Sequence, residues 1–369
     1  MIFDFRRELI LSPFFENLKL VCFVSSWISC ISLIIWTSNA NIIADVGSFL
    51  FVFVLLLTIP ALKVQSIFII SFLIFLFFVI SNQMPSKNTL FDSLNYILIF
   101  AGLIPTLGLV RATAFRLISV KESQSRLSKL SENHMAPGFQ LAAHLFGAVI
   151  NTGVFAMLSA ALPKTSSSNY RKLAAEAALR GMSSSAIWSP FFVAFVVGQT
   201  YIDPVNAWTG LAVGVGVALV FSICSIMAIN KGNFFTNIVT STSCLFPVLP
   251  ILIFIIFVVI TAAIFFKLTA LSAIIIVMPI LVSLYFCYRP DQVRSIVTET
   301  VAHLKSSTDD IVVISVAMII GFLITKDLNA LKTLSNLQIF SVPGWFILIF
   351  IPTAMASLSL IGIHPVISS

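Results

Sequence analysis

Two polar clusters interrupt apolar stretches of this sequence, and their side chains are suited to binding a small ion. Asn151, Thr152 and Gly153 lie at the centre of the apolar stretch 139–162. The second cluster comprises Ser183, Ser184, Ser185, Ser189 and Pro190. Hydroxyl, amide and free backbone groups at helix ends bind ions through hydrogen bonds and the helix dipole. The clusters predict a substrate-binding or ion-binding site, and they supply neither a catalytic residue nor a set of metal ligands.

Proline is the reason to expect backbone groups without helical hydrogen bonds at the second cluster. Pro190 cannot donate to the helix ladder and clashes with the preceding turn, so a helix should break or kink there. His364 and Pro365 repeat this pattern close to the last residue of the sequence, and both belong to the predicted site. The alternative is that these prolines kink packed helices and bind no ligand.

The composition identifies the elements that must position these clusters as membrane helices. Only 9% of the 369 residues are charged and 59% are hydrophobic, whereas soluble domains carry roughly 25% charged residues. High hydrophobicity excludes a disordered chain, and long unbroken apolar runs exclude the alternating strands of a β-barrel. The net charge of +7 is typical of basic cytoplasmic loops, so we expect no nucleic-acid partner. The sequence predicts an all-α polytopic membrane protein.

Nine apolar runs are long enough to cross a bilayer, which takes about 20 helical residues. They are 18–37, 43–62, 64–81, 93–111, 184–202, 207–228, 249–266, 268–287 and 345–362. Two further apolar stretches, 139–162 and 311–324, do not fit a simple crossing. The first contains the Asn151 cluster, and the second has only fourteen residues before Lys326 and Asp327.

Basic residues in short loops predict which side of the membrane each loop occupies. Arg6, Arg7 and Lys19 place the N-terminus in the cytoplasm. The polar segments 112–138 and 163–183 are both rich in Lys and Arg, so both should be cytoplasmic. The stretch 139–162 between them would then enter and leave on one side, as a re-entrant hairpin. The alternative is a single polar helix, with 163–183 outside against the rule.

The second half of the chain resembles the first in the order of its elements. We predict an N-terminal helix in 1–40, then a first repeat in 41–228 with the hairpin 139–162 and a broken helix near 183–190. A second repeat would occupy 229–369 and be incomplete at its C-terminus, with 311–324 in its own re-entrant hairpin. Internal repeats with interrupted helices in matching places are typical of secondary transporters.

This order of elements resembles the ion transporter superfamily of secondary carriers, which includes divalent anion/sodium symporters, citrate carriers and arsenite exporters. The resemblance covers about residues 40–369 and implies two re-entrant hairpins, each followed by a discontinuous helix. It also implies Ser-Asn-Thr-type hairpin tips that bind substrate carboxylate and sodium. Ile150-Asn151-Thr152-Gly153 resembles the first tip without its leading serine, and Ser183–Pro190 resembles the following break. The second hairpin has Gly321–Thr325 in place of such a tip.

The expected function is secondary active transport of a small organic or inorganic anion across a bacterial-type inner membrane. Na⁺ or H⁺ is the candidate coupling ion, no other cofactor is expected, and a homodimer is a candidate assembly. No G-x-x-x-x-G-K-[ST] motif is present, which argues against a self-contained ATP-driven pump. The alternatives are a membrane-embedded enzyme acting on a lipid and a non-catalytic membrane subunit of a larger complex.

A few isolated residues allow two interpretations. Asp45 lies near the start of the second span, where an acid is either functional or at the water interface, and we favour the interface. His144 and His364 could sense protons or contact substrate, although single histidines near helix ends more often bond to the backbone. The five cysteines are interpreted as packing residues.

Overall fold

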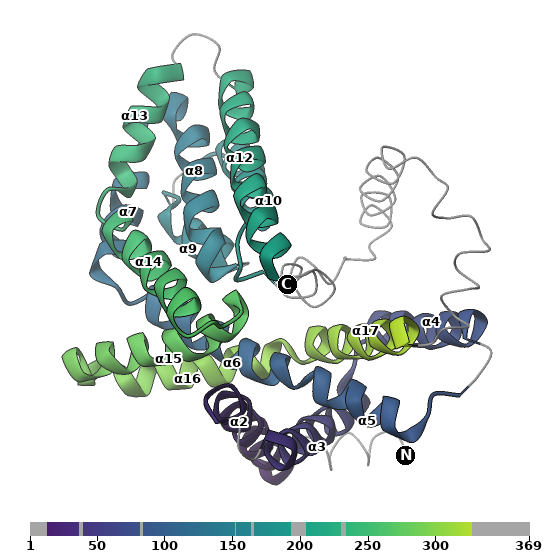
Figure 1. Ribbon diagram of the computed structural model, residues 1–369. Helices are drawn as coiled ribbons and strands as arrows, with labels where there is room; N and C mark the ends of the chain where they lie inside the picture. The colour runs from purple at the N-terminus through teal and green to yellow at the C-terminus, as the bar shows by residue number, and fades with distance from the viewer. Residues whose placement is uncertain are drawn as a thin grey trace. The chain divides into compact units, whose positions relative to one another are not determined.

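The computed structural model describes residues 13–36, 40–81, 84–151, 153–163, 166–192, 204–229 and 234–326. Every regular element within these ranges is a helix (Figure 1). The predicted all-helical class is confirmed for this part of the chain.

The α-helices differ in length and in polarity, since most are apolar and a few carry several charged residues. They are α2 (Pro13–Ile35), α3 (Ala40–Thr58), α4 (Val64–Ile80), α5 (Lys87–Tyr96), α6 (Leu98–Ala114), α7 (Ile118–Leu127), α8 (Glu132–Ile150), α9 (Gly153–Ala161), α10 (Ser168–Ala186), α12 (Pro204–Ile229), α13 (Phe234–Leu245), α14 (Leu249–Phe265), α15 (Ala270–Tyr288), α16 (Val293–Ser306) and α17 (Thr308–Lys326). Two short 3₁₀ turns, η1 (Ile59–Ala61) and η2 (Pro290–Gln292), follow α3 and α15.

Six helices or continuous helix pairs are long and apolar enough to cross a membrane. They are Phe14–Ile35, Asn41–Ala61, Lys87–Ala114, Thr209–Ala228, Ala270–Tyr288 and Thr308–Lys326. A seventh candidate is the pair α13 and α14, which is bent by 75° between its two helices. These spans support an integral membrane protein with several crossings.

The expected nine spans and the structure differ in particular elements. The run 64–81 forms α4, which is apolar but has only 17 residues, so it is slightly shorter than the six candidate spans. The run 345–362 and most of 184–202 lie outside the described residues. The stretch 311–324, expected as a half-depth arm, is part of the continuous 19-residue helix α17. Its first turn contains Thr308, Asp309 and Asp310. Acidic side chains at this end of a helix are stabilised by the helix dipole.

Side-chain caps explain where several helices begin. The hydroxyl oxygens of Ser86, Ser167 and Thr269 accept hydrogen bonds from the backbone N–H three residues later, at the starts of α5, α10 and α15. Such caps satisfy N–H groups that have no partner inside the helix.

The described helices divide into two compact units. Unit 1 lies within 1–105 and 301–369, and unit 2 within 106–300. The two repeats predicted from the sequence, 41–228 and 229–369, stay a prediction.

In unit 1, α2 and α3 pack closely, because a Cβ on Gly47 would lie 2.6 Å from the Cβ of Ser29. The rings of Tyr96 and Phe322 join α5 to α17, with centroids 5.0 Å apart.

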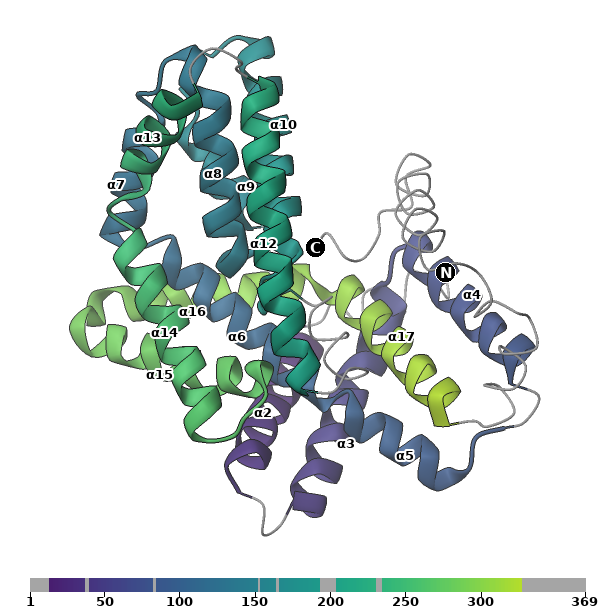
Figure 2. The same cartoon turned by 45° about the horizontal axis from the view of Figure 1, so that its top comes forward.

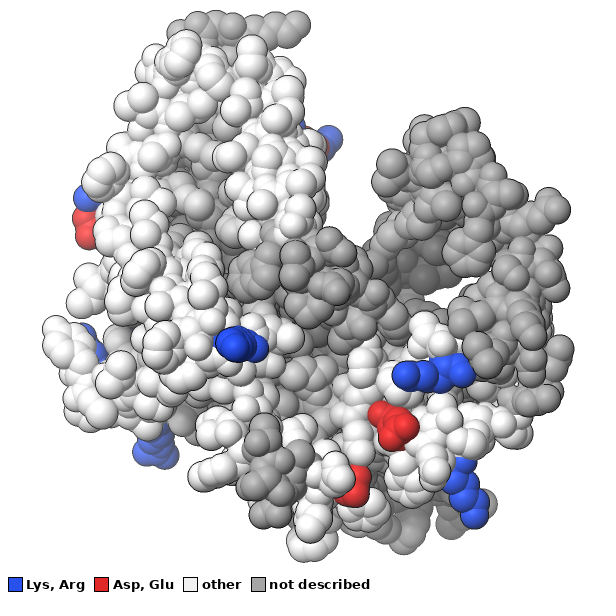
Figure 3. Space-filling view, in the orientation of Figure 1, with Lys and Arg blue, Asp and Glu red and all other residues white. Residues whose placement is uncertain are grey.

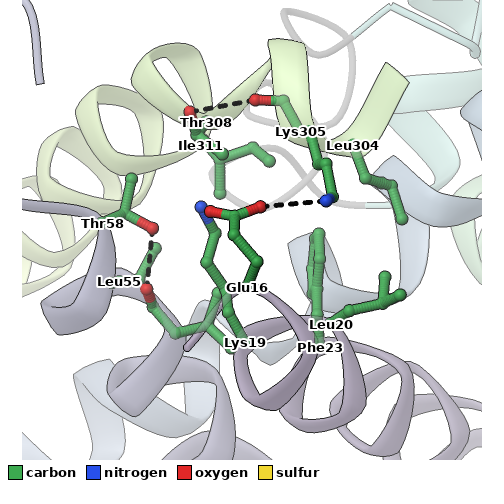
Figure 4. A pocket seen from close by; sticks show the side chains of 11 residues that line it. Glu16, Lys19, Leu20, Phe23, Leu55, Thr58, Leu304, Lys305, Thr308 and Ile311 are labelled. Atoms are coloured by element: carbon green, nitrogen blue, oxygen red, sulfur yellow. Dashed lines mark hydrogen bonds and ion pairs between the residues drawn. The ribbon is translucent and has the colours of Figure 1, made fainter. Parts of the chain in front are cut away.

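Two ion pairs join further elements of unit 1. Lys305 pairs with Glu16 at 3.1 Å, and Lys63 pairs with Asp309 at 3.1 Å. Figure 4 shows Glu16 and Lys305 at a small cavity of about 20 Å³, which has room for about one water molecule.

In unit 2, the helices α8, α10 and α12 lie side by side in both views (Figures 1 and 2). Arg116, just after α6, donates to the carboxylate of Glu299 at 2.5 Å and to the hydroxyl of Ser295 at 2.8 Å. These bonds attach the end of α6 to α16.

Apolar side chains cover much of the surface of the described helices. Phe49, Phe68, Phe75, Phe257 and Phe265 each expose more than half of their area. On the face drawn in Figure 3, Lys, Arg, Asp and Glu are few and scattered among the described residues. Such surfaces on long apolar helices are those that lipid covers.

Candidate functional site

The helices α8 and α10 run parallel and in close contact. A Cβ on Gly181 would overlap the carbonyl oxygen of Gln140, and Ser184 lies farther along α10 against His144. Ser189 lies farther again and contacts Ala148. Because these contacts advance in the same direction along both helices, α8 and α10 end at the same level.

Asn151 ends α8 with an unusual backbone conformation. Its φ of 52° and ψ of −137° are outside the helical region, and asparagine adopts positive φ more readily than most residues. The Asn151 N–H still donates to the carbonyl of Gly147, and its own carbonyl accepts from Val154. Asn151 therefore lies between the end of α8 and the start of α9.

The short helix α9 belongs to the return of the chain between α8 and α10. Since α8 and α10 are parallel, the segment 151–167 must bring the chain back toward the start of α8. The amide of Gln124 on α7 donates to the Met157 carbonyl at 2.9 Å, which fixes α9 against α7. The result is a helix, an interruption and a returning helix.

A second interruption lies at the end of α10. The helix ends at Ala186, and Ser189 donates its hydroxyl hydrogen to the carbonyl of Ala148. The N–H of Phe191 donates to the Ser189 hydroxyl oxygen at 3.2 Å. Pro190 has no N–H to donate to a helix ladder, which is consistent with the end of α10 shortly before it. The two interruptions meet through Ser189 and Ala148.

The structure brings together only some of the residues predicted for the site. Ser184, Ser185 and Ser189 are buried against α8, and Ser183 is exposed on the other side of α10. Pro190 and Trp188 adjoin an apolar cavity of about 70 Å³. Thr152, His364 and Pro365 lie outside the described residues.

His144 is a polar member of the α8–α10 contact. Its Nδ1 lies 2.8 Å from the Ser184 hydroxyl oxygen, and its ring lies 5.8 Å from the ring of Trp188. Ser184 also donates to the Gly181 carbonyl, so His144 and Ser184 are held in place by the helix pair.

Arg111 is a residue that the sequence clusters did not reveal. It lies on α6, and a Cβ on Gly153 would lie 2.8 Å from its Nε. Gly153 is the first residue of α9, so a guanidinium group lies against the start of this helix. Two features of the sequence could have indicated this contact. They are a basic residue at the edge of an apolar span and a glycine directly after the interruption.

Two buried polar atoms near the interruptions have no hydrogen-bond partner among the described residues. They are the side-chain oxygen Oδ1 of Asn151 and the indole nitrogen Nε1 of Trp188. Buried polar atoms are normally hydrogen-bonded, so both are groups that a ligand or water could satisfy.

The arrangement offers opposite partial charges within one region. The C-terminal ends of α8 and α10 lie side by side, and helix C-termini carry partial negative charge. The N-terminus of α9 carries partial positive charge, and Arg111 adds a full one. The carbonyl ends of α8 and α10 therefore suit a cation, and the start of α9 together with Arg111 suits an anion. Within the described residues, no group of three or more His, Cys, Asp or Glu could hold a metal.

An apolar cavity of about 290 Å³ lies beside the end of α8. Phe146, Val149 and Ile150 of α8 line it, together with side chains of α6, α7, α14 and α15. Among the lining residues, Thr113 and Tyr285 are the two with hydroxyl groups. This cavity fits an apolar ligand, in contrast to the polar interruptions nearby.

Comparison with known proteins found no matching family model, no matching curated protein and no matching solved structure.

Proposed function

We propose that this protein is a secondary active transporter of a small organic or inorganic anion. The observation that carries the proposal is the meeting of two helix interruptions, at Asn151 and Ser189, with Arg111 against the start of α9. Interrupted helices that meet in this way form the substrate and ion sites of many secondary transporters.

In this proposal the stretch 139–162 is a re-entrant hairpin that enters from the cytoplasm. The parallel course of α8 and α10 requires the chain to return between them, and the basic segments 112–138 and 163–183 favour the same side. Irregular backbone inside a membrane is tolerated where protein or water surrounds it. The N-terminus would be cytoplasmic and the membrane a bacterial-type inner membrane.

Each part of the site has a proposed role. Arg111 and the N-terminal N–H groups of α9 would bind the anion, because the helix end adds the equivalent of about half a positive charge. The carbonyl-rich ends of α8 and α10 would bind the coupling cation, Na⁺ in the first instance and H⁺ as the alternative. Ser189 holds the two helix ends together through its bond to the Ala148 carbonyl, and Ser185 packs against Gly147 of α8.

The apolar cavity of about 290 Å³ favours a second candidate function. A lipid chain or another apolar molecule would fit it, as expected for a membrane-embedded enzyme acting on lipid or for a lipid-dependent subunit of a complex. The lining supplies the Tyr285 and Thr113 hydroxyls and no carboxylate or imidazole, which supports binding more than catalysis.

The test is ligand-dependent thermal stability of the purified protein in detergent. Carboxylates and oxyanions are added singly, with and without sodium, because a ligand of the folded state raises its stability by RT ln(1 + [L]/Kd). We expect a shift for one anion class that increases with sodium. Asn151→Ala should lose this shift and remain folded, whereas the exposed Asn169→Ala serves as the matched control.

Two results would count against transport of an anion. One is a well-folded sample in which no anion produces a shift, and the other is a shift that Asn151→Ala leaves unchanged. A shift produced by lipids alone would favour the second candidate function.

A further inference from the structure

A separate polar groove of about 820 Å³ lies in unit 1, between α3 and α5. Its polar lining residues are Asn41, Asp45, Ser48, Asn88, Asp92 and Asn95. Apolar side chains, including Phe49 and Phe91, complete it. The groove shares no residue with the interruptions at Asn151 and Ser189, so it is independent of the proposed anion site.

The chemistry of this lining is uniform. All six polar side chains carry oxygen, two are carboxylates, and no Lys, Arg or His lines the groove. Hard divalent cations such as Ca²⁺ and Mg²⁺ prefer ligands of this kind, with carboxylates, amide oxygens and waters around the ion. The two aspartates, Asp45 and Asp92, would balance the charge of such a cation.

Ser48 gives an independent indication of a ligand. It lines the groove, is only 3% exposed, and its hydroxyl oxygen has no hydrogen-bond partner among the described residues. A buried hydroxyl without a partner is costly. A cation or its bound water in the groove would satisfy this oxygen.

The groove is partly organised in the structure. The Asn95 amide donates to one carboxylate oxygen of Asp45 at 2.9 Å, which leaves the Asn95 amide oxygen available for another contact. Asp92 has no hydrogen bond or ion pair within the described part of the chain. Gly47 lies against Leu98, the first residue of α6, so α3 also packs against the helix that follows α5.

The groove lies near the ends of its two helices, where water has access. Asp45 and Asp92 are exposed and lie near the starts of the candidate spans Asn41–Ala61 and Lys87–Ala114. The volume exceeds that of a bare ion, so several waters would remain bound, which Mg²⁺ in particular prefers. Lys63 follows the opposite end of α3, so the predicted orientation directs the groove away from the cytoplasm.

We propose that the α3–α5 groove binds a partly hydrated divalent cation, Ca²⁺ or Mg²⁺, through Asp45, Asp92 and Ser48. The experiment measures thermal stability of the full chain in detergent during titration with CaCl₂ or MgCl₂, with choline chloride holding the ionic strength constant. We expect a saturable rise with one or both cations. Asp45→Asn and Asp92→Asn should each weaken the apparent affinity at least about tenfold.

Ser48→Ala separates binding from folding. Its hydroxyl forms no hydrogen bond within the described residues, so without cation the variant should be at least as stable as the wild type, and it should bind the cation less tightly. Glu132→Gln, an exposed acid at the start of α8, is the control for loss of one negative charge and should titrate like the wild type.

Three outcomes would overturn the proposal. The first is no shift with either cation, and the second is an equal shift in the two aspartate variants and the wild type. The third is that spermidine, an organic polycation, reproduces the shift and depends on the same residues, since the groove would then bind cations without selecting a metal.

Discussion

Arg111 and Gly153 connect two helices that are far apart in the sequence, and their contact is central to the proposed anion site. The absence of a side chain at Gly153 lets the guanidinium group lie against the first turn of α9. Asn151, Ser189 and Pro190 could be predicted from residue type, because proline and asparagine disturb helices wherever they occur. Arg111 could not, since its role depends on tertiary contact and not on its neighbours in the chain.

Gly153→Ala should displace Arg111, because the added Cβ would lie 2.8 Å from its Nε. We expect anion binding to weaken about tenfold or more, the effect of losing about 1.4 kcal/mol of interaction, while the protein remains folded. The anion-dependent stability shift is the measurement. Gly210→Ala is the matched control, because no atom lies within 4 Å of its added Cβ. Equal anion affinity in both variants would contradict a role for Arg111.

The elements show where sequence patterns predict helices well and where they do not. Proline is expected to end or kink a helix, and α10 ends at Ala186, shortly before Pro190. The expected arm 311–324 is shorter than α17, because the polar residues Thr308–Asp310, which an apolar pattern leaves out, form the first turn of this helix. Apolarity sets where a span can lie, whereas capping and the helix dipole set where the helix begins.

Gly181→Ala tests the contact between α8 and α10. The new Cβ would overlap the Gln140 carbonyl oxygen and approach the Ala143 Cβ to 2.7 Å, so the helices must separate. We expect a loss of about 1–3 kcal/mol in stability, typical of an overpacked core, measured as a lower unfolding temperature in detergent. Gly216→Ala, on open surface, should be neutral or slightly stabilising, because alanine favours helix. Equal stability of the two variants would exclude close packing at Gly181.

At the scale of the whole molecule, the amino-acid composition predicts the fold class more reliably than any single motif does. A chain with 9% charged residues can satisfy its backbone in lipid only as helices or closed barrels, and the described residues form helices. The number of spans and the internal repeat depend on single polar residues and on loop charges, which composition does not contain. They remain predictions.

Thiol labelling from the two sides of the membrane tests the re-entrant hairpin. Ser125→Cys on α7 and Asn169→Cys on α10 place thiols at exposed positions before and after 139–162. In a background without native cysteines, both should react from the cytoplasmic side, and Lys87→Cys from the other side. Labelling of Ser125→Cys and Asn169→Cys from opposite sides would make 139–162 a single crossing.

The shared polar contact between α8 and α10 also has a consequence for biosynthesis. Each helix buries polar groups on the other, with His144 against Ser184 and Ser189 against Ala148. A helix that leaves such groups unpaired partitions poorly into lipid. The ribosome completes α8 well before Ser189 emerges, so we expect α8 to wait at the translocon. The two helices would then leave it together, as one inserted unit.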